Sequence, residues 1–148
     1  MDKLGVIARS PLFEMLSDQE LDYVAELSRP RSLAAGQVMF EEGALGDSLF
    51  VIVSGEVEVL RRDATGVQKL IAVLNPMEFF GEMSLVDKDY RSATIRARTD
   101  VELLQLSAEN LTTFRKNYRD CFTFVIINIA RVLSTRLREA NTRLAARL

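Results

Sequence analysis

Residues 79–94, FFGEMSLVDKDYRSAT, place a carboxylate and a guanidinium in one short segment. Gly81 lets the backbone approach a bound group closely, and the residues after it can form one helical turn whose free N–H groups attract an anion. Arg91 adds a fixed positive charge and a fork of donors that suits phosphate oxygens. Glu82 would repel an anion, so its natural partner is a donor such as a sugar hydroxyl.

The segment can also supply apolar walls, because Phe79 and Phe80 precede Glu82 and Leu85 lies between Glu82 and Arg91. An anion-binding group, a hydroxyl acceptor and apolar walls match the phosphate, sugar and base of a nucleotide. The same two charges can instead form an internal ion pair that only holds the loop together. Residue type and spacing alone leave these two interpretations equal.

A helix is predicted at residues 17–27, before the segment that carries the strands. Ser17 and Glu20 make a capping-box pattern, in which each residue satisfies a free backbone N–H at the start of a helix. Leu21 and Val24 begin an apolar series at helical spacing. Pro30 ends the helix, because the residue before a proline avoids the helical conformation.

From residue 37 the chain changes to short apolar runs separated by turn residues: VMF, SLFVIV, EVEVL, KLIAVL, ATIRA and VELLQL. In the run EVEVL, Val57 and Val59 alternate with glutamates and so share one face. Many short strands with frequent turns favour an antiparallel barrel or jelly roll. Glycines at the joints favour turns with positive φ, namely Gly36, Gly43, Gly46, Gly55 and Gly66.

After Leu106 the pattern is helical again, with Ser107 as a candidate N-cap. We therefore expect an α+β fold in a single domain over residues 1–148. N-terminal helices would occupy residues 1–36, a β-barrel or jelly roll with the loop 79–94 would occupy residues 37–107, and long C-terminal helices would occupy residues 108–148.

The segment FGEMSLVDKDYRSATIRA resembles the phosphate-binding cassette of the cyclic-nucleotide-binding domain family, in which F-G-E is followed nine residues after the Glu by Arg and small residues. The upstream FEEGALGDSLFVIVSGEVEVL is also similar, and the resemblance extends over residues 12–148. Tyr90 is a departure, since many members have proline before the Arg. The family includes bacterial catabolite activator proteins, kinase regulatory subunits and some ion channels.

This resemblance implies a regulatory module that binds cyclic AMP or cyclic GMP. The backbone near Phe80 and Gly81–Ser84 would hold the cyclic phosphate, Glu82 would bind the ribose 2′-hydroxyl, and Arg91 would neutralise the phosphate. Ser92 could reach the 2-amino group of guanine, but members that prefer cyclic AMP also carry serine there, and we favour cyclic AMP. The implied ligand-binding residues are Phe80, Gly81, Glu82, Met83, Ser84, Arg91, Ser92 and Ala93.

The C-terminal helix carries two apolar stripes. Ile126, Ala130, Leu133, Leu137, Ala140 and Leu144 follow a heptad spacing that favours a parallel homodimer, and Phe122, Val125, Ile129 and Val132 suit packing on the barrel. The alternative is a single amphipathic helix with a frayed end. Arg136, with Ser134 and Thr135, lies where the helix could cover the base as a lid.

The composition argues against several classes of function. The sequence has no histidine and one cysteine, Cys121, so common general bases and metal ligands are missing, and we expect neither an enzyme nor a metal site. We also expect a cytoplasmic protein with a packed, reduced thiol. No stretch is apolar enough to span a membrane.

The charge of the chain is uneven. The net charge is −2, but from Asn110 onward eight Lys and Arg face two Asp and Glu. This basic end can indicate a nucleic-acid partner, but a solvated arginine-rich helix face is the favoured interpretation. Two alternatives to a sensor module remain: the sensor half of a catabolite-activator-like transcription regulator without its DNA-binding domain, and a dimerisation scaffold that binds no nucleotide.

Overall fold

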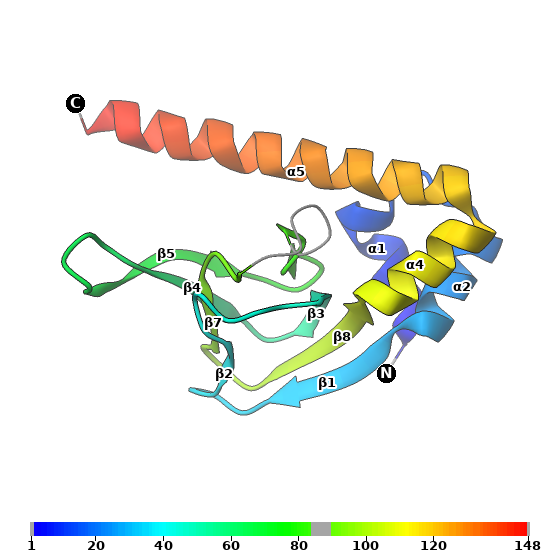
Figure 1. Cartoon of the computed structure of the whole chain (residues 1–148), viewed down its shortest axis with the longest axis horizontal. Helices are drawn as coiled ribbons and strands as arrows, with labels where there is room; N and C mark the ends of the chain where they lie inside the picture. The colour runs from blue at the N-terminus through cyan, green and yellow to red at the C-terminus, as the bar shows by residue number, and fades with distance from the viewer. Residues whose placement is uncertain (1, 84–89, 148) are drawn as a thin grey trace.

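The computed structural model describes residues 2–83 and 90–147. These residues form an α+β fold with two four-stranded antiparallel sheets, as predicted (Figure 1). The strand orders are β1-β8-β3-β6 and β2-β7-β4-β5, an arrangement of the jelly-roll kind. The strands are β1 Arg29–Leu33, β2 Val38–Phe40, β3 Ser48–Ser54, β4 Val57–Arg62, β5 Gln68–Leu74, β6 Phe79–Phe80, β7 Thr94–Ala97 and β8 Val101–Ser107.

Helices lie at both ends of the chain: α1 Lys3–Arg9, the 3₁₀ turn η1 Pro11–Phe13, α2 Asp18–Leu27, α4 Ala108–Asn117 and α5 Arg119–Ala146. The predicted capping box of α2 is confirmed, since Ser17 accepts a hydrogen bond from the backbone N–H of Glu20 and Glu20 accepts one from that of Ser17. Ser107 caps α4 in the same way. Among the described residues, every helix is too short or too polar to form a transmembrane span.

The predicted helical character of residues 1–36 is wrong at its C-terminal end. β1 begins at Arg29 and pairs antiparallel with β8, Pro30 lying opposite Leu104. Its first four residues are exposed, so the strand has no apolar alternation that a sequence could reveal. β1 lies at the edge of its sheet, where a proline is tolerated because its missing N–H is not needed for pairing.

The glycine prediction is confirmed at four of its five positions. Gly36, Gly43, Gly55 and Gly66 have φ between +85° and +88°. Gly46 is the exception, because its φ lies outside the left-handed region. Turn geometry therefore accounts for the first four glycines and leaves Gly46 to be explained.

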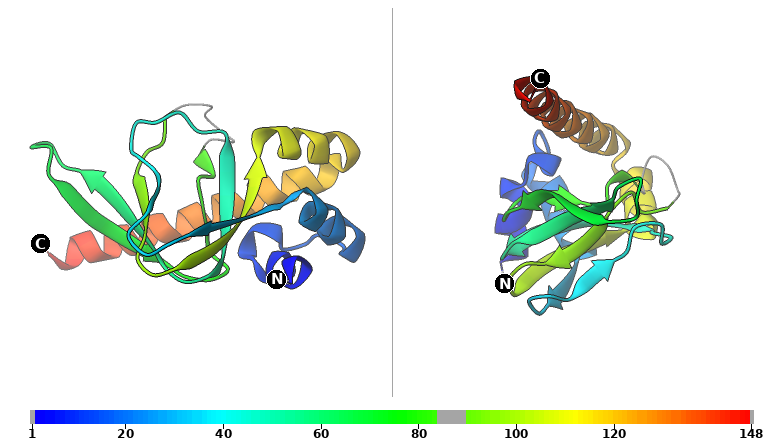
Figure 2. Two further views of the ribbon diagram at one scale, coloured as in Figure 1. Left: turned by 90° about the horizontal axis from the view of Figure 1, so that it is seen from below. Right: turned by 90° about the vertical axis from the view of Figure 1, so that its left-hand side faces the viewer.

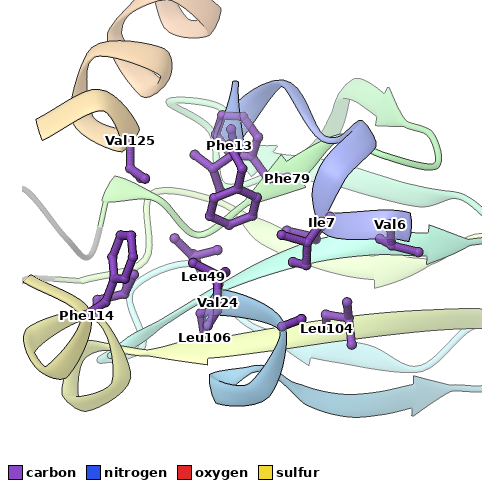
Figure 3. Packing of buried hydrophobic residues seen from close by; sticks show 14 of the residues in the cluster. Val6, Ile7, Phe13, Val24, Leu49, Phe79, Leu104, Leu106, Phe114 and Val125 are labelled. Atoms are coloured by element: carbon purple, nitrogen blue, oxygen red, sulfur yellow. The ribbon is translucent and has the colours of Figure 1, made fainter. Parts of the chain in front are cut away.

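The strand β3 separates two hydrophobic cores. Leu49 and Val51 face the helices and pack in a cluster with Phe13, Phe79 and Phe114, among others (Figure 3). Phe50 and Ile52 face the inside of the barrel and pack in a second cluster that contains Phe80, Ile95 and Leu103. Because both faces of β3 are buried, its sequence is a continuous apolar run.

α5 crosses the domain, and its C-terminal half extends toward the end at which the β4–β5 hairpin projects (Figures 1 and 2). Its N-terminal half is anchored by Val125 and Ile129, which are buried in the first core. Asn128 is also buried, and its Nδ2 donates hydrogen bonds to the carbonyl oxygens of Leu12 at 3.1 Å and Glu14 at 2.8 Å. This amide fixes the position of α5 along the N-terminal segment.

We predict that Asn128→Ala lowers the free energy of unfolding by about 1–3 kcal/mol, because the buried carbonyl of Leu12 loses its donor and the hydrogen bond to Glu14 is also lost. Urea denaturation of the two proteins measures the difference. Asn141→Ala, at an exposed position of the same helix, is the matched control and should change stability little. Equal losses in the two variants would contradict the anchoring role of Asn128.

Candidate functional site

A cavity of about 230 Å³ opens between the barrel and α5. Its lining combines the charged groups Glu82, Arg91 and Arg136 with apolar residues of β2, β4, β5 and β7. The residues that line the cavity are Phe40, Val59, Ile71, Ala72, Leu74, Phe80, Gly81, Glu82, Met83, Tyr90, Arg91, Ser92, Ala93, Ile95 and Arg136.

The backbone of Arg91 is held by the segment between β2 and β3. The N–H of Arg91 donates to the carbonyl of Ala44 at 2.7 Å, and the N–H of Gly43 donates to the carbonyl of Arg91 at 2.8 Å. An isolated antiparallel bridge pairs the neighbouring Tyr90 with Leu45. These contacts bring together two segments that are far apart in the sequence and so fix where the arginine enters the site.

The side chain of Arg91 is buried, with 7% of its surface exposed. Its guanidinium carbon lies 4.0 Å from the centre of the Phe40 ring, and its Nη1 donates to the carbonyl of Gly81 at 3.3 Å. Burial lowers the pKa of Arg91, and the charges of Asp47 and Glu82 act in the opposite direction. A permanent positive charge is therefore held beside an apolar cavity, where an anionic group would find strong attraction.

Glu82 is the second buried charged group, with 6% of its surface exposed. Its Oε1 lies 3.7 Å from Nη1 of Arg136, which reaches the site from α5. Burial raises the pKa of Glu82, while its own backbone N–H, Arg136 and Arg91 partly offset this rise. The structure thus pairs the carboxylate with the C-terminal helix.

Arg136 makes two further contacts with β6. Its Nη2 donates to the carbonyl oxygen of Phe79 at 3.2 Å, and its guanidinium carbon lies 5.2 Å from the centre of the Phe79 ring. The predicted position of Arg136 near the site is therefore seen, although its action as a lid stays a prediction. These contacts join the second half of α5 to the strand that leads to the charged residues of the cavity.

Gly81 has a positive φ and little space around it, although its close approach to a bound group stays a prediction. Its φ is +82°, and a Cβ at this position would lie 2.7 Å from the carbonyl oxygen of Ser48 and 2.9 Å from Nη1 of Arg91. Both the backbone conformation and the lack of space therefore require glycine here.

The structure brings together seven of the eight predicted ligand-binding residues: Phe80, Gly81, Glu82, Met83, Arg91, Ser92 and Ala93 all line the cavity. The eighth, Ser84, lies outside the described residues, as do Leu85 and most of the predicted helical turn. Their roles in binding a ligand stay predictions.

The sequence analysis missed most of the apolar lining of the cavity. Val59 had a usable signal, because its alternation with glutamates placed it on the inner face of β4. Phe40 had none, since only the pairing of β2 with β7 brings it to Arg91. Tyr90 was noted as a departure from the family pattern but not as a lining residue. The other missed residues are Ile71, Ala72, Leu74 and Ile95.

Residues 30–118 match the family model of the cyclic nucleotide-binding domain. The chain is 37% identical over 135 residues to a cyclic AMP receptor protein of Thermus thermophilus, a match that covers 91% of this chain and 61% of that protein. The chain belongs to the cyclic nucleotide-binding domain family. It spans about 60% of the length of the first curated relatives that it matches.

Two solved structures illustrate the similarity of the fold. A cyclic nucleotide-binding domain from Methylobacillus flagellatus superposes with a TM-score of 0.87 at 26% identity, covering 98% of this chain and 82% of that chain. The N-terminal domain of a transcriptional regulator from Streptomyces coelicolor superposes with a TM-score of 0.77 at 34% identity, covering 94% of each chain.

The raised pKa of Glu82 predicts how stability depends on pH. Because the folded protein favours the neutral carboxyl, wild type should gain stability as the pH falls through the folded-state pKa toward the ordinary value of 4.5. Glu82→Gln mimics the neutral form, so its stability at neutral pH should equal or exceed that of wild type.

Thermal unfolding of both proteins without ligand, at neutral pH and near pH 5, measures this difference, which should shrink in acid. Glu26→Gln, at an exposed position of α2, controls for the removal of a carboxylate in general. A variant that is much less stable than wild type at neutral pH would contradict the direction of the pKa shift.

Proposed function

We propose that this domain is a regulatory sensor that binds a cyclic nucleotide, cyclic AMP in preference to cyclic GMP, without catalysis. The observation that carries the proposal is the pair of buried, opposite charges, Arg91 and Glu82, in the lining of a cavity whose other residues are mostly apolar. Arg91 neutralises the cyclic phosphate, Glu82 accepts a hydrogen bond from the ribose 2′-hydroxyl, and the apolar lining receives the base.

The preference for cyclic AMP is supported by the relative from Thermus thermophilus, which is described as a cyclic AMP receptor protein. The cavity itself is consistent with either purine. Ser92 is exposed at the cavity, where its hydroxyl is available to a guanine 2-amino group as well. Base choice is therefore tested by titrating both nucleotides.

Ligand binding is proposed to act on α5 through Glu82. This carboxylate already contacts Arg136 of the helix, and a ribose hydroxyl that binds the same group changes the energy of that contact. The residues of α5 after Leu133 are exposed except for Arg136, which is half-buried. A ligand with different affinities for two positions of this helix shifts their populations, which would pass the signal to the surface of the domain.

The exposed stripe of α5 supports a parallel homodimer. Leu137 is 62% exposed and Leu144 is 61% exposed. On the same predicted seam, Ala130 precedes these two leucines and Ala140 lies between them. Ile126 and Leu133 instead pack partly against the first core of their own domain. The seam available to a second copy is therefore shorter than the heptad pattern indicated.

The process that the sensor regulates depends on the domain or protein to which it is joined. The similar structure from Streptomyces coelicolor, the N-terminal domain of a transcriptional regulator, favours a second candidate, in which this domain is the sensing half of a transcription regulator whose DNA contacts are made elsewhere. We propose no direct nucleic-acid contact for this chain, no metal requirement and a cytoplasmic location. A scaffold that binds no nucleotide is the remaining alternative, and the buried Arg91 and Glu82 argue against it.

Arg91→Ala is predicted to weaken cyclic AMP binding by about 1.5–3 kcal/mol, roughly ten- to a hundred-fold in Kd, because the phosphate loses a charged partner. Isothermal titration calorimetry with cyclic AMP and with cyclic GMP measures the effect. Arg98→Ala, at an exposed position, is the matched control and should bind as wild type does. Undiminished affinity in Arg91→Ala would refute the phosphate assignment.

Leu137→Glu is predicted to give monomers, because the substitution places like charges opposite each other along the two-fold contact. Sedimentation velocity of wild type and variant, with and without cyclic AMP, measures the assembly state. Val38→Glu replaces another exposed residue, on β2, and should leave the dimer intact. A wild type that stays monomeric at high concentration with saturating ligand would show that α5 does not form this interface.

A further inference from the structure

Gly46 lies between β2 and β3, directly before Asp47. Its φ is not in the left-handed region, unlike those of Gly36, Gly43 and the three other glycines with positive φ. The φ of Gly46 therefore does not by itself exclude alanine. A glycine at such a position is normally a disadvantage, because it increases the entropy that the chain loses on folding.

The space around Gly46 supplies a different reason for a glycine. A Cβ added to Gly46 would lie 1.9 Å from Nε, 2.2 Å from Cζ and 2.7 Å from Cδ of Arg91. All three atoms belong to the ligand-binding arginine. By contrast, a Cβ at Gly36, Gly43 or Gly66 would meet nothing within 4 Å.

Arg91 has little room to yield to such a Cβ. Its guanidinium carbon lies 4.0 Å from the centre of the Phe40 ring, and its Nη1 is bonded to the carbonyl of Gly81. Only 7% of the residue is exposed. A side chain at position 46 would therefore force the guanidinium away from Phe40 and Gly81, and so out of its place beside the cavity.

We propose that Gly46 is a positioning residue for the phosphate-binding arginine, and that its lack of a side chain sets the place of the Arg91 guanidinium. Only the predicted effect of Gly46 on ligand affinity rests on the proposed function. Gly81 also lies close to Arg91, but the positive φ of Gly81 requires glycine independently, whereas at Gly46 the three atoms nearest to an added Cβ all belong to Arg91.

The first experiment needs no ligand. Thermal unfolding is measured for wild type, Gly46→Ala, Arg91→Ala and the double variant. In the wild-type background Gly46→Ala should lower the midpoint of unfolding, and in the Arg91→Ala background the same change should have no effect or raise the midpoint, since the clash is gone and the unfolded chain is less flexible. Equal losses in both backgrounds would overturn the proposal.

The second experiment measures cyclic AMP affinity by calorimetry. Gly46→Ala should weaken binding by about ten-fold or more, because the phosphate loses a well-placed charged donor. Gly66→Ala is the control: it strains a positive-φ turn of the β4–β5 hairpin where no atom lies within 4 Å of the new Cβ, so it should lower stability and leave affinity unchanged.

The two experiments separate the inference from the proposed function. If wild type binds neither cyclic AMP nor cyclic GMP, the proposed function fails, and the unfolding comparison still decides whether Gly46 makes room for Arg91. If wild type binds and Gly46→Ala binds equally well, the positioning role is overturned.

Discussion

The site is organised around two buried, opposite charges, those of Arg91 and Glu82, which line a largely apolar cavity. Removing a charge from water costs free energy unless nearby groups compensate for the loss. Here the compensation comes from several elements at once: the loop after β2 holds the backbone of Arg91, β6 and Gly81 shape the space between the charges, and Arg136 of α5 contacts Glu82. The barrel and the C-terminal helix are thus joined through a charged site.

The two halves of the C-terminal helix are held by different kinds of contact. Its first half has an apolar face in the core and is fixed by the buried amide of Asn128. Beyond Leu133, the helix is held by its half-buried residue Arg136 instead of by apolar packing. Arg136 contacts β6 and Glu82. A contact between charged groups responds to a ligand that binds one of them, whereas packing in a filled core responds little. The second half is therefore the part of the helix on which the proposed ligand response would act.

Local sequence patterns were sufficient for most of the fold, and the charged residues of the site came from the family resemblance. Capping residues placed α2 and α4, the apolar run SLFVIV indicated the strand β3, and the resemblance of residues 79–94 to a phosphate-binding cassette singled out Glu82 and Arg91, because their spacing alone left an internal ion pair equally possible. The failures share one cause, which is that long-range pairing decides them. The first four residues of the edge strand β1 are exposed. Phe40 reaches Arg91 only through the pairing of β2 with β7. Gly46 is a glycine because the side chain of Arg91, far along the sequence, occupies the space that a Cβ would need.

The central claim is that the two buried charges serve two different parts of one ligand. The most direct measurement is calorimetry of the wild-type protein with cyclic AMP, 2′-deoxy cyclic AMP and adenosine. The account predicts that loss of the 2′-hydroxyl and loss of the phosphate each weaken binding by about ten-fold or more, because each leaves a buried charge without its ligand partner. Equal affinity for all three compounds, or no binding of cyclic AMP, would contradict it.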